Sequence, residues 1–178
     1  MPRKSGMIAM AQQNFLSIWF DPQGVSRYSD GTFNILYTAT ERECAETERC
    51  YWAVECFLKS GTVSDLKGFF MYTCDITGRH TDYTKNWRKN KKLVHPTNYT
   101  YCHQLGHRAL TRGVDYLLVP SARKFRGHCI PVFKQGSGRV KRVVDAFDFG
   151  WDAKAQKAFI KKGKVRRYVT IDDVYARL

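Results

Sequence analysis

Three polar residues of different chemistry stand in the stretch RYSDGTFNILYTATERECAETE, which runs from Arg27 to Glu48. The stretch reads as a strand followed by a helix, with the cation of Arg27 at its start, the hydroxyl of Tyr37 in the strand and the carboxylate of Glu48 in the helix. Residues two apart in a strand share a face, so Tyr37 points with Ile35. These side chains are either parts of a polar site or a structural ion pair with a satisfied tyrosine.

The position of Glu48 on its helix is the most informative feature of this stretch. It shares a face with four apolar or aromatic residues, Cys44, Ala45, Tyr51 and Trp52. A lone carboxylate on such a stripe costs free energy unless a donor meets it, and Arg27, just before the turn into the strand, is the candidate donor. Three other glutamates of the same helix need no such burial: Glu41, Glu43 and Glu46.

The elements that must position these residues are a mixture of strands and helices. Strands are predicted where β-forming residues cluster between turn signals, at 15–20, 33–39, 68–75, 115–121, 129–135 and 139–149. Helices are predicted over 41–59, where Thr40 and Glu43 have capping-box spacing, and over 99–112. Residues 1–10 are expected to form a loose N-terminal arm and residues 81–104 a loop or lid. No repeat or linker is present, so residues 1–178 are predicted to form one compact α+β domain with a central mixed sheet and flanking helices.

The net charge of +14 is placed unevenly, because residues 1–84 carry a net −2 and residues 85–178 a net +16. The basic half could attract nucleic acid, anionic lipid, an acidic protein or a phosphorylated small molecule. No run of 18 apolar residues occurs, so no membrane span is predicted. The basic N-terminus lacks the cleavage site of a signal peptide, and the chain is therefore expected to be cytoplasmic.

Two further patterns suggest metal or nucleic acid. His103 and His107 lie one helical turn apart, but the glutamate of a zinc-protease motif is missing and no cysteine has zinc-site spacing. We therefore predict structural or surface histidines and no metal site, and we expect the six cysteines to be reduced. The segment KNWRKNKK at 85–92, with tyrosines on either side, interleaves cations and aromatics as single-stranded nucleic acid sites do. A basic nucleic-acid-binding module thus stays open as an alternative.

Two blocks, residues 27–48 and 113–135, resemble the RES-domain family, the toxins of bacterial toxin–antitoxin systems. The family's first block appears here in order as Arg27, Gly31-Thr32, Leu36-Tyr37-Thr38 and Glu48. Its second block, which follows an LG helix, appears as Leu105-Gly106, Gly113, Asp115, LLVPSAR at 117–123 and IPVF at 130–133. The polar positions in register are Arg27, Tyr37, Glu48 and Ser121.

This resemblance implies a fold similar to ADP-ribosyltransferase toxins and an enzyme that degrades NAD by cleaving the bond between nicotinamide and ribose. Glu48 would stabilise the positive charge on the ribose or orient a ribose hydroxyl. Arg27 would hold the pyrophosphate through its bidentate fork. Tyr37 would stack on the nicotinamide end of NAD or form a hydrogen bond with it. Ser121 would donate to the carboxamide or to a ribose oxygen, and Arg123 is also expected to bind NAD. NAD is then the substrate, and no cofactor is implied.

The resemblance also implies a cognate antitoxin of helix-turn-helix type as partner, without a membrane or nucleic acid as a direct partner. Water or phosphate would accept the ADP-ribose. The main alternative is a mono-ADP-ribosyltransferase that passes ADP-ribose to a protein. Both activities require Glu48, whereas a nucleic-acid-binding module does not.

Overall fold

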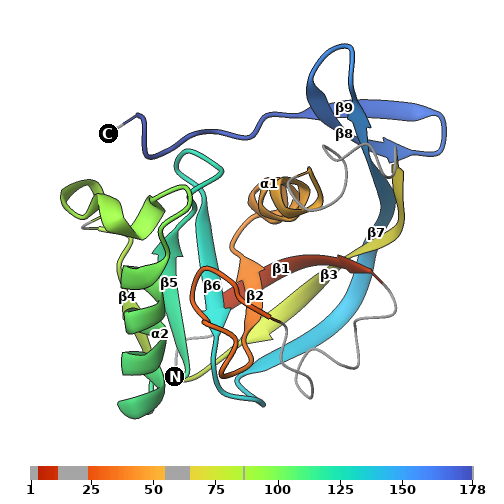
Figure 1. The fold of residues 1–178 in the computed structure, drawn as a ribbon. Coiled ribbons are helices and arrows are strands. Elements are labelled where there is room, and N and C mark those ends of the chain that lie inside the picture. The colour runs from red at the N-terminus through yellow and green to blue at the C-terminus, as the bar shows by residue number, and fades with distance from the viewer. Residues whose placement is uncertain (1–3, 12–23, 55–64, 86, 178) are drawn as a thin grey trace.

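The computed structural model describes residues 4–11, 24–54, 65–85 and 87–177, which form a nine-stranded sheet and two α-helices (Figure 1). The strands are β1 (Lys4–Ala11), β2 (Leu36–Ala39), β3 (Asp65–Ile76), β4 (His80–Asp82), β5 (Tyr116–Pro120), β6 (His128–Val132), β7 (Gly138–Asp152), β8 (Lys157–Lys162) and β9 (Val165–Val169). The α-helices are α1 (Arg42–Ala53) and α2 (Thr100–Thr111), and two short 3-10 helices are η3 (Trp87–Lys89) and η4 (Lys91–Val94).

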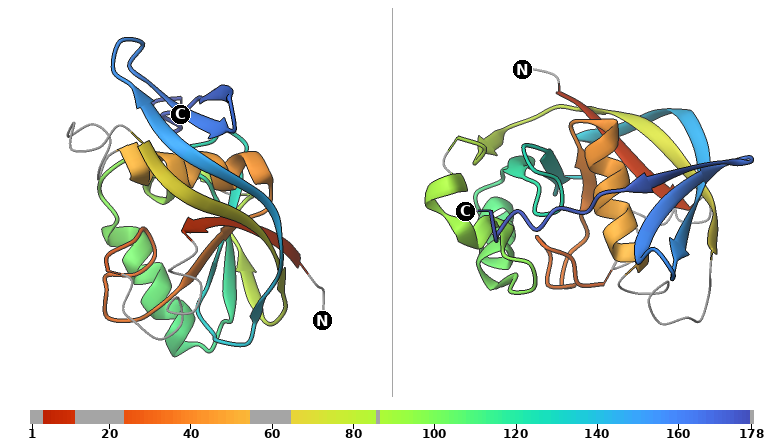
Figure 2. Two further views of the ribbon diagram at one scale, coloured as in Figure 1. Left: turned by 90° about the vertical axis from the view of Figure 1, so that its right-hand side faces the viewer. Right: turned by 90° about the horizontal axis from the view of Figure 1, so that it is seen from above.

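The sheet has the order β4-β5-β6-β2-β1-β3-β7-β8-β9. The pair β4–β5 is parallel and the other neighbouring pairs are antiparallel, so the predicted mixed sheet of an α+β domain is confirmed. The long strand β7 curves, and it brings the β8–β9 hairpin back over α1 (Figures 1 and 2). Helix α2 lies at the opposite end of the domain from this hairpin (Figure 2).

The apolar interior consists of two clusters on opposite faces of the sheet. The strand β5 shows the division, because Leu117 and Val119 pack in the cluster that includes both α-helices, whereas Tyr116 and Leu118 pack against strands β2, β3 and β6. A strand buried on both faces reads as an unbroken apolar run, which is what residues 116–120 show.

Most predicted elements are confirmed to within a few residues. The predictions 68–75, 99–112, 115–121, 129–135 and 139–149 correspond to β3, α2, β5, β6 and β7, and the predicted strand 33–39 shortens to β2. The predicted strand 15–20 and the predicted end of the first helix lie outside the described residues. The capping box is wrong: no side chain caps α1, because the Thr40 hydroxyl donates instead to the carbonyl of His128 on β6, at 3.3 Å.

The prediction of a loose arm over residues 1–10 is also wrong for its described part, residues 4–10, because β1 lies inside the sheet between β2 and β3. A side chain at Gly6 would not fit there, since an added Cβ would lie 2.7 Å from Cδ1 of Ile76 and 2.9 Å from Oγ1 of Thr38. The segment 81–104 is less irregular than a loop, because it contains the end of β4, both 3-10 helices and the first turn of α2. None of the helices in the described ranges is long and apolar enough to cross a membrane.

Candidate active site

The carboxylate of Glu48 is buried on α1 and held through one of its two oxygens. Oε1 accepts a hydrogen bond from Ser121 Oγ at 2.5 Å and another from the thiol of Cys129 on β6 at 3.5 Å. Oε2 accepts no hydrogen bond from the described part of the chain. The carboxylate is therefore fixed in direction while one oxygen is left for another partner.

Ser121 follows β5 and connects that strand to Glu48. Its Oγ accepts hydrogen bonds from the backbone N–H groups of Arg123 and Lys124, each at 3.0 Å, and donates its one proton to Glu48. A hydroxyl has a single donor, so this arrangement leaves none for a ligand. The Ser121 hydroxyl therefore fixes the direction of the Glu48 carboxylate, and the contact with the substrate that the family resemblance implies stays a prediction.

The guanidinium of Arg27 is 4% exposed and lies close to the same carboxylate without forming an ion pair with it. Nη1 donates to the carbonyl of His95 at 2.8 Å, and the group stacks on the ring of Tyr99, 4.5 Å from its centroid. Burial lowers the pKa of Arg27, but the neighbouring Tyr37 and Glu48 more than offset this, so the net pKa is raised. Arg27 is therefore a permanently charged group, and the ion pair with Glu48, which was one of the two readings of this stretch, is absent from the described residues.

Arg123 provides a second buried guanidinium beside the first, with 5% exposure. Its Nη2 donates to the carbonyl of Pro96 at 2.5 Å and lies 3.4 Å from the hydroxyl of Tyr99. The guanidinium carbon lies 3.5 Å from the centroid of the Tyr51 ring. The two arginines thus donate hydrogen bonds to the adjacent carbonyls of residues 95 and 96, and the side chain of Tyr99 contacts both guanidiniums.

Tyr37 on β2 lies next to Tyr28, a residue that sequence reasoning missed. Their rings stack with centroids 6.3 Å apart and an interplanar angle of 25°. Both hydroxyls are enclosed and make no hydrogen bond of normal geometry within the described chain, and burial raises the pKa of each. A buried phenol without a partner is costly. Its position directly after Arg27 in the first block was the signal available for Tyr28.

The loop that carries Arg27 is fastened to α2. Gly106 packs so closely on this loop that an added Cβ would lie 2.1 Å from the carbonyl oxygen of Tyr28, and His103 Nε2 donates to the carbonyl of Ser26 at 2.8 Å. The glycine of the LG helix is thus required for close approach and has a structural role.

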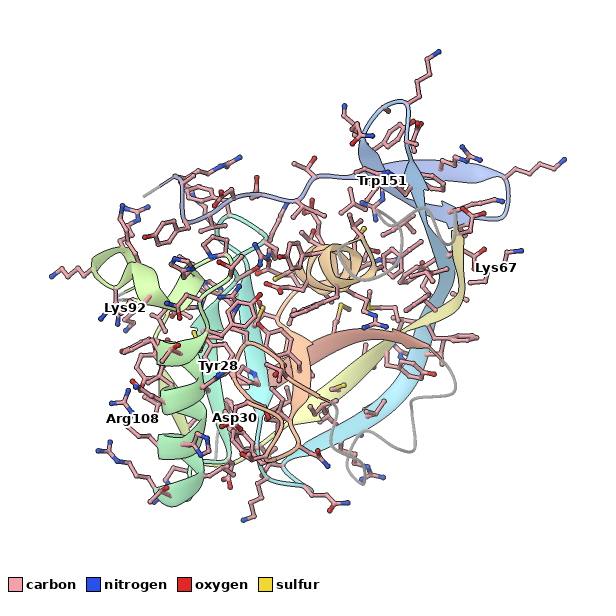
Figure 3. All side chains as sticks on the ribbon, in the orientation of Figure 1. Tyr28, Asp30, Lys67, Lys92, Arg108 and Trp151 are labelled. Atoms are coloured by element: carbon pink, nitrogen blue, oxygen red, sulfur yellow. The ribbon has the colours of Figure 1, made fainter. Side chains whose placement is uncertain are left out.

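His107, the second histidine of α2, also binds this loop. Its Nε2 lies 2.7 Å from Oδ2 of Asp30, which Figure 3 labels beside α2, and Thr32 donates to the same carboxylate. The Thr32 hydrogen bonds and His107 lower the pKa of Asp30. Both histidines therefore serve structure here, and the described residues contain no group of three side chains suited to a metal ion.

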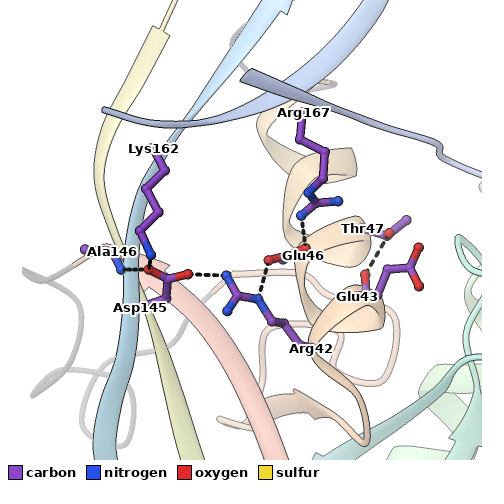
Figure 4. Close-up of polar contacts among 8 residues, drawn as sticks. All are labelled: Arg42, Glu43, Glu46, Thr47, Asp145, Ala146, Lys162 and Arg167. Atoms are coloured by element: carbon purple, nitrogen blue, oxygen red, sulfur yellow. Dashed lines mark hydrogen bonds and ion pairs between the residues drawn. The ribbon is translucent and has the colours of Figure 1, made fainter. Parts of the chain in front are cut away.

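Glu46, which was expected to be exposed, is 2% exposed, and this expectation is wrong. Arg42 donates to Glu46 Oε1 at 2.8 Å, and Arg167 of β9 binds Oε2 (Figure 4). Arg42 also binds Asp145 on β7, whose pKa Lys162 and Arg42 lower to about 2. The reason for the error is that β9 returns over α1, a contact between residues 121 positions apart that no local pattern reveals.

Comparisons with known proteins give a matching family and a similar solved structure. The family model of the RES domain matches residues 11–152. The crystal structure of the M. tuberculosis MbcT–MbcA toxin–antitoxin complex is similar, with a TM-score of 0.59 and 14% sequence identity over 81% of this chain and 84% of that chain. At this identity the likeness concerns the fold alone. A comparison with curated proteins returned no match.

Proposed function

The chain belongs to the RES domain family, and from this premise we propose that it is the toxin of a toxin–antitoxin pair that degrades NAD by cleaving its nicotinamide–ribose bond. The observation that carries the proposal is the pair of buried guanidiniums of Arg27 and Arg123, together with the buried carboxylate of Glu48 near Arg27. The likeness to a protein crystallised in a toxin–antitoxin complex supports the toxin role.

The charges at the site favour a doubly anionic ligand. Arg27 and Arg123 are both nearly inaccessible, and no described carboxylate forms an ion pair with either one. Burying an unpaired charge is costly, so two guanidiniums with only Glu48 nearby leave a positive excess that an anion can neutralise. A guanidinium fork matches phosphate oxygens in pairs, and the pyrophosphate of NAD offers a phosphate to each fork.

Glu48 is suited to the bond-breaking step. When the bond between C1′ of the ribose and the nicotinamide nitrogen breaks, its electron pair neutralises the nicotinamide ring and positive charge develops on the sugar. Oε2, which the described chain leaves without a donor, can face this charge or accept a ribose hydroxyl while Ser121 holds Oε1. An acceptor oxygen then bonds to C1′ and releases its proton. The departing nicotinamide is neutral, so the step needs neither an acid nor a metal ion.

The tyrosine pair is the candidate for the nicotinamide end. The enclosed hydroxyl of Tyr37 lacks a normal hydrogen bond and stands near both Arg27 and Glu48. A carboxamide carries both donors and an acceptor, so it can satisfy such a hydroxyl. We assign the contact to Tyr37 and the support of its ring to Tyr28.

The β8–β9 hairpin is the surface we propose for the antitoxin. It exposes Lys164 and Arg166, and between and beside them Val165 and Tyr168 are 70% and 49% exposed. Cations interleaved with exposed apolar side chains suit an acidic protein segment. That the antitoxin is of helix-turn-helix type is an expectation from the family resemblance.

Product analysis tests the proposed function. The purified chain is incubated with NAD labelled in the adenylate half, with and without phosphate, and nicotinamide, ADP-ribose, phosphorylated ADP-ribose and protein-bound label are measured. We expect free nicotinamide with a soluble ADP-ribose product. Label retained on protein would establish the mono-ADP-ribosyltransferase instead. Intact NAD, together with salt-dependent binding of an oligonucleotide, would favour the nucleic-acid-binding module.

A further inference from the structure

The C-terminal segment 170–177 follows β9 and passes over α1 and the loop between β5 and β6 (Figure 1). It lies outside residues 11–152, which the family model matches. The view from above shows it running from the β8–β9 hairpin over α1 toward the end of the domain that contains α2 (Figure 2). Residues 170–173 have no strand partner among the described residues, and residues 174–177 form a turn, so side-chain and single backbone contacts must hold the segment.

Asp172 fastens this segment to the loop that follows Ser121. Its backbone N–H donates to the carbonyl of Arg123 at 2.8 Å, and its Oδ2 accepts from the backbone N–H of Phe125 at 2.8 Å. Its Oδ1 pairs with Arg177 at 2.7 Å. The two hydrogen bonds to Arg123 and Phe125 lie on either side of Lys124, so Asp172 fixes the path of the loop at this point. The same loop carries the Arg123 guanidinium.

Tyr175 fastens the same segment to the loop that both arginines grip. Its ring lies 4.7 Å from that of His95, and the neighbouring Val174 is 1% exposed. The carbonyls of His95 and Pro96 are the acceptors for Arg27 and Arg123. The segment therefore supports the anchor points of both guanidiniums.

We propose that Asp172 and Tyr175 are positioning residues, which hold Arg27 and Arg123 in place to bind the pyrophosphate of NAD. This inference rests on the proposed NAD-cleaving function. Neither residue reaches Glu48, which α1, Ser121 and Cys129 hold. The guanidiniums must be placed before the ligand arrives, since ordering them on binding would cost affinity. Loss of the segment's contacts thus weakens the binding of NAD far more than it slows the bond-breaking step.

The test combines steady-state kinetics with direct binding. Asp172→Ala leaves the N–H of Phe125 without its acceptor, and we expect KM for NAD to rise about tenfold while kcat stays within about threefold of wild type. Asp172→Asn keeps an acceptor oxygen for that N–H and should restore most of the affinity. Asp173→Ala is the matched control, because within the described ranges Asp173 accepts a hydrogen bond only from Ala176 of the same segment, and this variant should behave as wild type.

The dissociation constant of NAD, measured by calorimetry with each change placed in the Glu48→Gln background, provides a readout independent of turnover. An unchanged dissociation constant for Asp172→Ala, or one equal to that of Asp173→Ala, would overturn the proposal. If Asp172→Ala does not fold, Tyr175→Ala against Tyr175→Phe decides it in the same way. A wild-type chain that binds NAD without releasing nicotinamide, while Asp172→Ala binds it more weakly, would refute the proposed function and leave the positioning role standing.

Discussion

Replacing Glu48 by glutamine separates a catalytic carboxylate from a structural one. Glutamine keeps an oxygen at the position of Oε1 that can accept hydrogen bonds from Ser121 and Cys129, and it puts an uncharged NH2 group in place of Oε2. The main loss is the negative charge opposite the developing ribosyl cation. Losing one such contact costs on the order of 10²–10³ in rate, or about 2.7–4 kcal/mol.

The effect of the same change on stability follows from the pairing of Arg27. If Glu48 were the structural partner of Arg27, its neutralisation would leave a buried charge unpaired and cost about 3–5 kcal/mol. The structure has no ion pair between them, since Arg27 binds the carbonyl of His95 and the ring of Tyr99. We therefore expect the free energy of unfolding to change by no more than about 1 kcal/mol.

Glu46 on α1 and Glu41, which precedes the helix, are the controls. Glu46→Gln removes a charge that lies between Arg42 and Arg167, so it should lower the melting temperature and leave nicotinamide release per folded molecule near wild type. Glu41 is exposed, and Glu41→Gln should change neither the melting temperature nor the release of nicotinamide. Thermal melts and nicotinamide release are measured on the wild type and on the three variants. A Glu48→Gln protein that melts early and still cleaves NAD at the wild-type rate per folded molecule would refute the catalytic assignment.

Three further predictions follow from the same site. Arg27→Lys should reduce kcat/KM nearly as much as Arg27→Ala, because an ammonium cannot make two parallel bonds to a phosphate; near-wild-type kcat/KM for Arg27→Lys would mean that a point charge suffices. NAD cleavage should persist in EDTA, since the leaving group is neutral nicotinamide, and loss of activity restored by a divalent ion would contradict this. The double change Lys161→Glu and Lys164→Glu should slow association with the antitoxin at low salt and leave NAD turnover unchanged; a parallel fall in turnover would assign the hairpin to the active site. Lys162 is left intact because it pairs with Asp145.

The sequence predicts those parts of the fold that local patterns encode. β5 and α2 were found because an apolar run and a helical period are local signals, and the predicted strand and helix placed Tyr37 and Glu48 on the correct elements. β1 was missed because KSGMIAMA combines glycine and alanine, which have low strand propensity, and its strand form depends on pairing with β3, more than 50 residues away.

The contacts within the site depend on the tertiary fold and could not be read from spacing. Nothing local shows that Arg27 and Arg123 would grip adjacent carbonyls, because the loop at residues 95–96 meets both only after folding. The burial of Glu46 likewise depends on a strand that follows it by more than 100 residues. The three hydrogen bonds that tie Ser121 to Glu48 and to the following backbone also depend on how β5 and α1 pack together.

The most direct test of the central claim is a crystal structure of the Glu48→Gln protein with NAD bound. The account predicts phosphate oxygens about 3 Å from both the Arg27 and the Arg123 guanidiniums, and the anomeric carbon of the nicotinamide ribose facing the side chain at position 48. NAD bound elsewhere, or a pyrophosphate that contacts neither arginine, would contradict it.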